Sequence, residues 1–119
     1  MIVTDPAMRK KMERALENSS YTLDDIEDAL LSGKMQSHVY NNTWIITQVY
    51  EFPRSTAVNI LFAVGDLEDT LEGAKMIESW AKALGAKTIT FTGREGWQEL
   101  KVPGWKKVGV IYSKDIDHG

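Results

Sequence analysis

The residues best placed to do chemistry lie where a buried strand gives way to a helix. Residues 57–64 form an almost unbroken apolar run, a Gly-Asp pair ends it, and residues 67–84 repeat apolar side chains at helical spacing. A second strand pattern follows at residues 88–92, so the segment predicts a βαβ unit with parallel strands. Ligands of such sheets bind at the turn from the first strand into the helix. In this chain the turn comprises residues 64–70, which makes it the candidate binding segment.

Other side chains with suitable chemistry lack partners in the sequence. No serine or carboxylate is placed to form a triad with His38 or His118, which we interpret as ordinary surface residues. Residues 24–28 hold four acids, but a solvated helix start explains that charge as well as a cation site does. Lys106 and Lys107, with Lys101 nearby, form a small basic patch beside Trp105 whose default role is surface solvation. We therefore predict no metal site and no confident catalytic residue.

The composition argues against several classes of function. The 14 basic and 17 acidic side chains give a net charge of −3, which argues against a nucleic-acid partner. The chain has no cysteine, and therefore no disulfide framework or thiol nucleophile. No window has the roughly 18 consecutive apolar residues of a membrane span, so we expect a soluble protein that does not bind membranes. Residues 1–119 are expected to form one domain, with a helix within residues 1–20 and a polar tail at 113–119.

The elements that must position the turn can be read from the same sequence. Pro6 after Thr4 and Asp5 begins a first helix, and Thr22 begins a second that closes at Gly33. The apolar period then changes to that of strands, and the predicted elements are strands at 36–40, 43–52 and 57–64, the helix at 67–84, a strand at 88–92, a short helix at 93–100 and a last strand at 105–114. We therefore predict an α/β fold: two N-terminal helices, an antiparallel meander, and a βαβ crossover in a three-layer mixed sheet.

This order of elements resembles the fold of the Gcn5-related N-acetyltransferases (GNAT), in a short form. The sequence has a pair of Gly-Trp dipeptides, Gly96-Trp97 and Gly104-Trp105, and residues 77–82 and 65–67 precede them. Together they resemble small GNAT-like proteins encoded by tailed bacteriophages, over residues 23–116. The βαβ portion alone is generic, whereas the two Gly-Trp dipeptides are moderately specific.

The resemblance implies an acetyl-CoA site, but the matching residues depart from the enzymes of the family. Those enzymes use a glycine-rich loop with a basic residue to cradle the pyrophosphate, whereas this loop has one glycine and the acids Asp66, Glu68 and Asp69. The tyrosine that often serves as general acid corresponds to Leu100, which cannot donate a proton. Glu51 is a weak candidate for a general base, with a simple strand-end glutamate as the alternative. If acyl-CoA binds, Val64, Gly65, Asp66 and Thr70 are the expected contacts.

Two functions therefore remain open. The first is a protein-binding or virion-associated module of a phage without transferase activity, located in the host cytoplasm or the phage particle, with no cofactor and a partner such as a phage structural protein. The second is an N-acetyltransferase dependent on acetyl-CoA, with an atypical cofactor loop. Arg94 and Trp97 are the expected interface residues of the first, because Trp and Arg dominate contacts at protein interfaces. A core position is the alternative for Trp97 and for Trp105.

Overall fold

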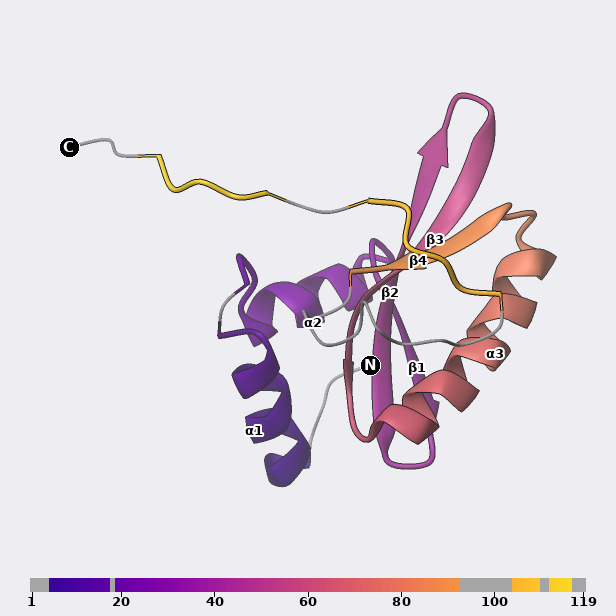
Figure 1. Cartoon of the computed structure of the whole chain (residues 1–119). Helices are drawn as coiled ribbons and strands as arrows, with labels where there is room; N and C mark the ends of the chain where they lie inside the picture. The colour runs from indigo at the N-terminus through magenta and orange to yellow at the C-terminus, as the bar shows by residue number, and fades with distance from the viewer. Residues whose placement is uncertain (1–4, 18, 93–103, 110–111, 117–119) are drawn as a thin grey trace.

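A four-stranded sheet has helices packed on both faces (Figure 1). The computed structural model describes residues 5–17, 19–92, 104–109 and 112–116. The elements in chain order are α1 (Pro6–Ala15), α2 (Leu23–Leu31), β1 (Gln36–Tyr40), β2 (Thr43–Phe52), β3 (Ser55–Val64), α3 (Leu67–Ala83) and β4 (Thr88–Phe91). This order confirms the predicted α/β fold with two N-terminal helices, a meander and a βαβ crossover.

Local side chains fix where the first two helices begin. The Asp5 side chain accepts a hydrogen bond from the Ala7 amide at 3.0 Å, with Pro6 in the first turn of α1. Thr22 and Asp25 form a reciprocal capping box at the start of α2, in which each side chain accepts from the backbone amide of the other. Both starts agree with those predicted from the sequence.

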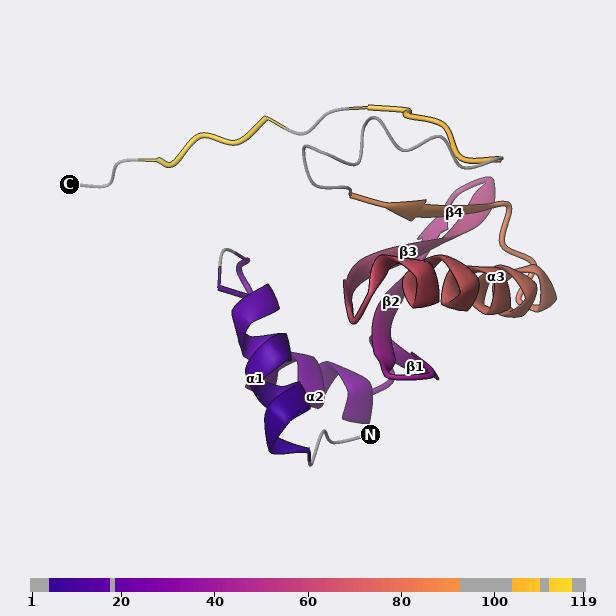
Figure 2. The same ribbon diagram turned by 60° about the horizontal axis from the view of Figure 1, so that its bottom comes forward.

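Two apolar cores hold the three layers together. On one face of the sheet, α1 and α2 pack against β2 and β3; Figure 2 shows these helices apart from α3, which covers the opposite face. The first core consists of Met8, Met12, Leu16, Leu23, Ile26, Met35, Ile46 and Val64, and the second of Ile45, Val58, Ile60, Ala74, Ile77 and Ala81. Neighbouring residues of β2 therefore supply different cores, as expected for a strand between two helical layers.

The strands are ordered β1-β2-β3-β4, antiparallel except for the parallel pair of β3 and β4. This parallel ladder covers only Ala57 to Ile60 of β3, opposite Thr88 to Phe91. The next residue, Leu61, has no partner in β2, because the register passes from Ile46↔Phe62 to Thr47↔Ile60. Such a bulge bends a strand, and here it coincides with the end of the pairing to β4.

The β2–β3 hairpin extends beyond its neighbours. Pairing of β1 with β2 stops at Gln36↔Thr47, and pairing of β3 with β4 starts only at Ala57. The tip is therefore a two-stranded ribbon that projects from the sheet (Figure 1), with Tyr50 and Phe52 exposed on it.

The predicted last strand is wrong for the described residues. Between 104 and 109 and between 112 and 116, the chain is extended but forms no strand. A strand needs a neighbour to accept its backbone hydrogen bonds, and alternation of side chains alone does not provide one. The predicted short helix at 93–100 lies outside the described residues.

At the turn from β3 into α3, close contact with the start of β2 restricts position 65 to glycine. Its φ angle is 149°, and a Cβ atom there would lie 2.7 Å from Thr43 Cβ and 2.9 Å from Thr43 Cα. Thr43 is itself fully buried, so it cannot move aside. Any side chain at position 65 therefore strains the backbone and collides with β2.

We expect Gly65→Ala to lower the free energy of unfolding by about 3 kcal/mol or more, because a strained backbone alone costs about 1–3 kcal/mol and the collision adds to it. Gly85→Ala is the matched control, since Gly85 also has a positive φ of 84° but no atom within 4 Å of its Cβ position. Urea unfolding of both variants measures the difference. An equal loss in the two variants would contradict a specific role for the contact with Thr43.

Candidate functional site

The strand-to-helix turn predicted from the sequence borders a pocket of ≈ 650 Å³. Three segments line it: the end of β3 with the turn into α3, the start of β2, and the exposed side of α1. The lining residues are Lys11, Arg14, Ala15, Asn42, Thr43, Ala63, Val64, Gly65, Asp66 and Asp69. The predicted residues Val64, Gly65 and Asp66 thus share one site, and Thr70 lies buried in the first turn of α3 behind them.

Two backbone donors in the first turn of α3 have partners within the protein. The Asp66 side chain caps the helix by accepting from the Asp69 amide at 2.7 Å, and the Thr70 amide donates to the Asp66 carbonyl at 3.0 Å. The Thr70 hydroxyl donates to the same carbonyl at 2.8 Å. Asp69 also accepts from the Asn41 side chain at 3.1 Å, which ties the helix to the β1–β2 turn. The amides of Asp69 and Thr70 are therefore already used within the protein.

The charges around the pocket nearly cancel. Lys11 and Arg14 of α1 face Asp66 and Asp69 across it, and Glu68 adds a further negative charge to the same turn of α3. An anion at this helix start would gain from the helix dipole but would lie among three carboxylates. The residues present therefore fit a pyrophosphate poorly, and we derive no reaction step through acetyl-CoA.

Lys11 and Arg14 are pocket residues that sequence reasoning missed. They lie three apart on the polar side of α1, whose buried side chains are Met8 and Met12. That spacing is typical of any solvated helix face and carries no signal of a site. Only the packing of α1 against β3 brings them to the turn. A local sequence pattern does not predict such packing.

Thr43 is a buried polar residue in the pocket wall. Its Oγ1 atom is shielded from solvent and has no hydrogen-bond partner among the described residues. An unsatisfied buried hydroxyl costs about 1–3 kcal/mol. Its position beside Gly65 makes the strand-to-helix turn the least satisfied part of the described core.

Glu51 does not contribute to this pocket. It lies exposed near the tip of the β2–β3 hairpin, opposite Thr56, whereas the opposite end of β2, at Trp44, pairs with Val64 beside the pocket. Glu51 lies seven residue steps along the strand from Trp44, which is roughly 23 Å. Arg94 and Trp97 lie outside the described residues.

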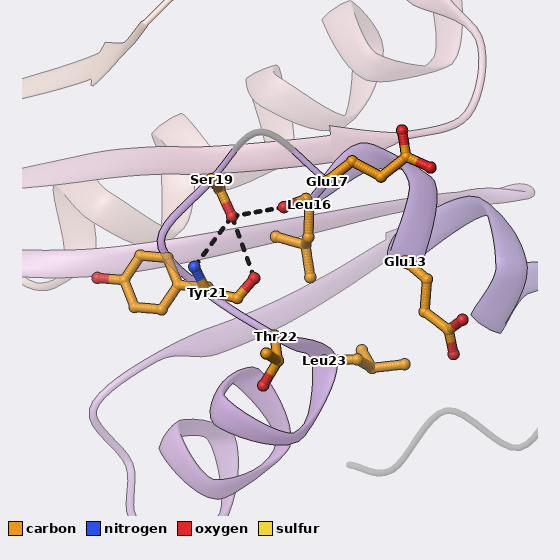
Figure 3. Close-up of a pocket in the computed structure, with 7 residues that line it drawn as sticks. All are labelled: Glu13, Leu16, Glu17, Ser19, Tyr21, Thr22 and Leu23. Atoms are coloured by element: carbon orange, nitrogen blue, oxygen red, sulfur yellow. Dashed lines mark hydrogen bonds between the residues drawn. The ribbon is translucent and has the colours of Figure 1, made fainter. Parts of the chain in front are cut away.

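A second pocket, of ≈ 340 Å³, lies at the turn between α1 and α2 (Figure 3). Glu13 and Glu17 lie at its rim, and Ser19 organises the turn: its hydroxyl lies 3.0 Å from the Leu16 carbonyl and accepts from the Tyr21 amide at 3.1 Å. These hydrogen bonds fix the chain reversal. The pocket therefore offers two carboxylates without a further polar group aimed at a ligand, and we assign it no function.

His38 is not the surface residue predicted from the sequence. Its ring packs edge-on against Trp80 of α3, with ring centroids 4.8 Å apart. Its Nε2 atom lies 2.9 Å from the buried Thr47 hydroxyl, which donates to Gln36 Oε1 at 3.0 Å. Because that hydroxyl has a single proton, Nε2 is the protonated nitrogen of the neutral ring. The burial lowers the pKa of His38 below its ordinary value of 6.5.

Among the described residues no group of three histidine, aspartate or glutamate side chains could hold a metal ion. Two of the four acids of α2 have other roles: Asp25 belongs to the capping box, and Glu27 pairs with Arg9 of α1 at 2.6 Å. In the described part of the chain, no helix has the length and apolarity needed to cross a membrane.

Comparison with known proteins supports the fold. No protein-family model matches the sequence, and no curated protein matches it significantly. Several solved structures are similar over most of this chain, and three of them represent the range. An acetyltransferase from Trypanosoma brucei has 13% identity and a TM-score of 0.62, with 92% of this chain and 91% of that chain covered.

The other two structures have similar TM-scores and coverage. A protein of Thermus thermophilus has 13% identity and a TM-score of 0.56, covering 91% of this chain and 94% of that one. An aminoglycoside acetyltransferase from an uncultured soil sample, solved with sisomicin, has 10% identity and a TM-score of 0.58, covering 88% and 84%. The fold of this protein is therefore GNAT-like, as predicted. Identities this low establish the fold alone.

The half-buried His38 gives a testable pH dependence. Because its pKa is lower in the folded protein, the unfolded chain takes up a proton first as the pH falls through 6.5. The contribution of His38 to the free energy of unfolding is therefore fully present above that pH and declines below it. The slope from this group is at most about 1.4 kcal/mol per pH unit. We expect His38→Gln to remove this part of the decline between about pH 7.5 and about pH 5.5.

Urea unfolding of both proteins across this pH range measures the effect. His118 and all carboxylates are common to the two proteins, so their titration largely cancels in the difference. Parallel pH profiles of the two proteins would contradict the lowered pKa of His38.

Proposed function

We propose that this chain is a GNAT-fold protein without transferase activity, which acts as a protein-binding or virion-associated module of a tailed bacteriophage. The observation that carries the proposal is the Asp66 carboxylate at the start of α3, 2.7 Å from the Asp69 amide. It occupies the helix start where a phosphate would bind, and Glu68 and Asp69 follow in the same turn. The chain uses this helix start for its own cap.

The energies favour that interpretation. A carboxylate at a helix start contributes about 0.3–1 kcal/mol to stability. A second negative charge brought to about 4 Å of it costs about 4 kcal/mol at the effective dielectric of a protein surface. Lys11 and Arg14 offset part of that repulsion but leave the pocket without a net positive charge. The gain from binding a pyrophosphate is therefore small.

The phage role and the protein partner come from the sequence. The Gly-Trp dipeptides resemble those of small phage proteins. Arg94 and Trp97 lie at the first of these dipeptides, close to one another in the chain. Trp and Arg are the residues most enriched among dominant interface contacts. We propose these two residues as the interface, a protein such as a phage structural component as the partner, and the host cytoplasm or the virion as the location. The net charge of −3 supports a partner other than nucleic acid.

One observation favours the alternative, an N-acetyltransferase with an atypical cofactor loop. Lys11 and Arg14 line the same pocket as Gly65 and Asp66, on the side that faces the start of α3. Two cations from α1 could replace the basic residue that the loop lacks. In this alternative, Val64, Gly65, Asp66 and Thr70 contact acyl-CoA.

Acetyl-CoA binding separates the two functions. At about 1 mM ligand, a Kd near 10 µM would stabilise the protein by about 2.7 kcal/mol, which is several degrees in Tm. We expect no such shift in a thermal melt of the wild-type protein. A rise of several degrees would overturn the proposal in favour of the transferase.

A charge variant tests the physical reason. Asp66→Asn, Glu68→Gln and Asp69→Asn together remove three negative charges but keep a side-chain oxygen at each position that accepts a hydrogen bond. We expect this triple variant to gain a Tm rise with acetyl-CoA. Glu72→Gln with Glu78→Gln, on the exposed side of α3, is the control and should gain none. No gain in the triple variant would contradict the electrostatic explanation.

The partner interface predicts a contrast between two tryptophans. Trp105 packs edge-on against Phe91, with centroids 4.9 Å apart, beside the second core. Trp105→Ala should therefore lower the free energy of unfolding by roughly 3 kcal/mol. Trp97→Ala should leave the Tm nearly unchanged and weaken association by about 2 kcal/mol or more.

Thermal melts and quantitative co-purification from infected host cells measure the two effects. Proteins that wild type captures and Trp97→Ala loses define the partner. Equal destabilisation by both substitutions would place Trp97 in the core and contradict its role as an interface residue.

A further inference from the structure

The pocket at the start of α3 separates positive from negative charge. Lys11 and Arg14 of α1 line one side of it, and Asp66 and Asp69 at the start of α3 line the other. In both views α1 and α3 lie on opposite sides of the end of β3 (Figures 1 and 2). Among the described residues no ion pair joins the two sides. A molecule in the pocket therefore meets both charges at once.

The two carboxylates each keep one oxygen atom available for a ligand. The Oδ1 atom of Asp66 accepts from the Asp69 amide, and the Oδ1 atom of Asp69 accepts from the Asn41 side chain. Their Oδ2 atoms have no hydrogen-bond partner in the part of the chain that the structure describes. Because an ammonium group donates three hydrogen bonds, it can bind both Oδ2 atoms while the helix cap stays in place.

The opposite side of the pocket suits a carboxylate. The side chains of Lys11 and Arg14 form no hydrogen bond or ion pair with another described residue. A carboxylate between them would accept charge-assisted hydrogen bonds from both, and the guanidinium group can donate two in parallel.

The rest of the described wall is mainly apolar. It contains the small side chains Ala15 and Ala63 and the buried Val64, which can contact an apolar group of a ligand. Thr43 is the buried polar residue of this wall, and its Oγ1 atom has no partner among the described residues. The volume of ≈ 650 Å³ lies within the range of pockets that bind small molecules.

We propose that this pocket binds a small zwitterion: an α-amino acid or a short peptide with a free ammonium group, a free carboxylate and an apolar side chain. The ammonium group binds Asp66 and Asp69, and the carboxylate binds Lys11 and Arg14. Such a ligand has no net charge, which matches two cations and two carboxylates, whereas a pyrophosphate does not. The inference goes beyond the proposed function, because it names a ligand for the pocket and involves no transfer reaction.

Analogues of leucine test the proposal on the wild-type protein. Leucine carries both charges, N-acetyl-leucine lacks the ammonium group, and leucinamide lacks the carboxylate. In ¹H–¹⁵N NMR titrations, leucine should shift the amide signals of Asn42, Gly65 and Asp66. We expect a Kd of about 1 mM, because the charged side chains of the pocket are mostly exposed to solvent. Each analogue should bind about tenfold more weakly, since it lacks one charge-assisted contact.

Leucyl-leucine, titrated in the same way, distinguishes the two sources of the zwitterion. Tighter binding than that of leucine would assign the pocket to peptides, and weaker binding would assign it to free amino acids. No binding of either compound, or equal affinity for leucine and its two analogues, would overturn the proposal.

Charge variants show which side of the pocket binds which group. Lys11→Gln with Arg14→Gln should abolish the preference for leucine over leucinamide. Asp66→Asn with Asp69→Asn should abolish the preference for leucine over N-acetyl-leucine. Each preference compares two ligands on one protein, so a change in stability alone does not produce the expected result.

Lys10→Gln with Lys34→Gln is the control, because both lysines are exposed and lie outside the pocket. This variant should keep both preferences. If both pocket variants also keep them, the assignment is overturned. The acetyl-CoA melt is a separate result: if neither acetyl-CoA nor leucine binds, this inference fails while the proposed function stands.

Discussion

The parallel pairing of β3 with β4 is the constraint on which the rest of the structure depends. It joins only four residues of each strand, yet it obliges α3 to cross over one face of the sheet. The bulge at Leu61 ends this pairing and turns the last part of β3 toward β2 alone. The carboxyl end of β3 is thereby separated from β4. This separation leaves the turn into α3 accessible beside α1, where the pocket lies.

Much of the fold could be predicted because its determinants are local. Asp5 and Thr22 identify helix starts through their own hydrogen bonds, and an Asn-Asn pair marks the two-residue turn between β1 and β2. The position of the candidate site could also be predicted, since a βαβ unit places its binding turn after the first strand. These features need only neighbouring residues.

The features that sequence reasoning missed all depend on residues far apart in the chain. The alternation in residues 105–114 is real, but whether it forms a strand depends on a neighbour that no local pattern specifies. His38 was interpreted as a surface residue because no residue near it in the sequence indicates its contact with Trp80. Lys11 and Arg14 reach the pocket only through the packing of α1. Long-range packing, rather than propensity, decided each of these positions.

At the start of α3, backbone geometry and side-chain charge are set by different residues. Backbone geometry fixes the turn, through Gly65 against Thr43, independently of the charges that surround it. The side chains of that turn then set what can approach. A common fold therefore constrains where a ligand would bind, and the carboxylates on the turn constrain which ligand.

The projecting β2–β3 hairpin has a consequence for the dynamics of the molecule. Its tip is held by one neighbouring strand on one side only, as shown by the pairs Glu51↔Thr56 and Phe52↔Ser55. An isolated two-stranded ribbon is marginally stable in water. Its amide protons should therefore exchange with solvent through local fraying, far faster than those of Ile45 and Val58 in the doubly covered centre of the sheet. The sheet thus combines a slowly exchanging centre with a tip that opens while the rest stays folded.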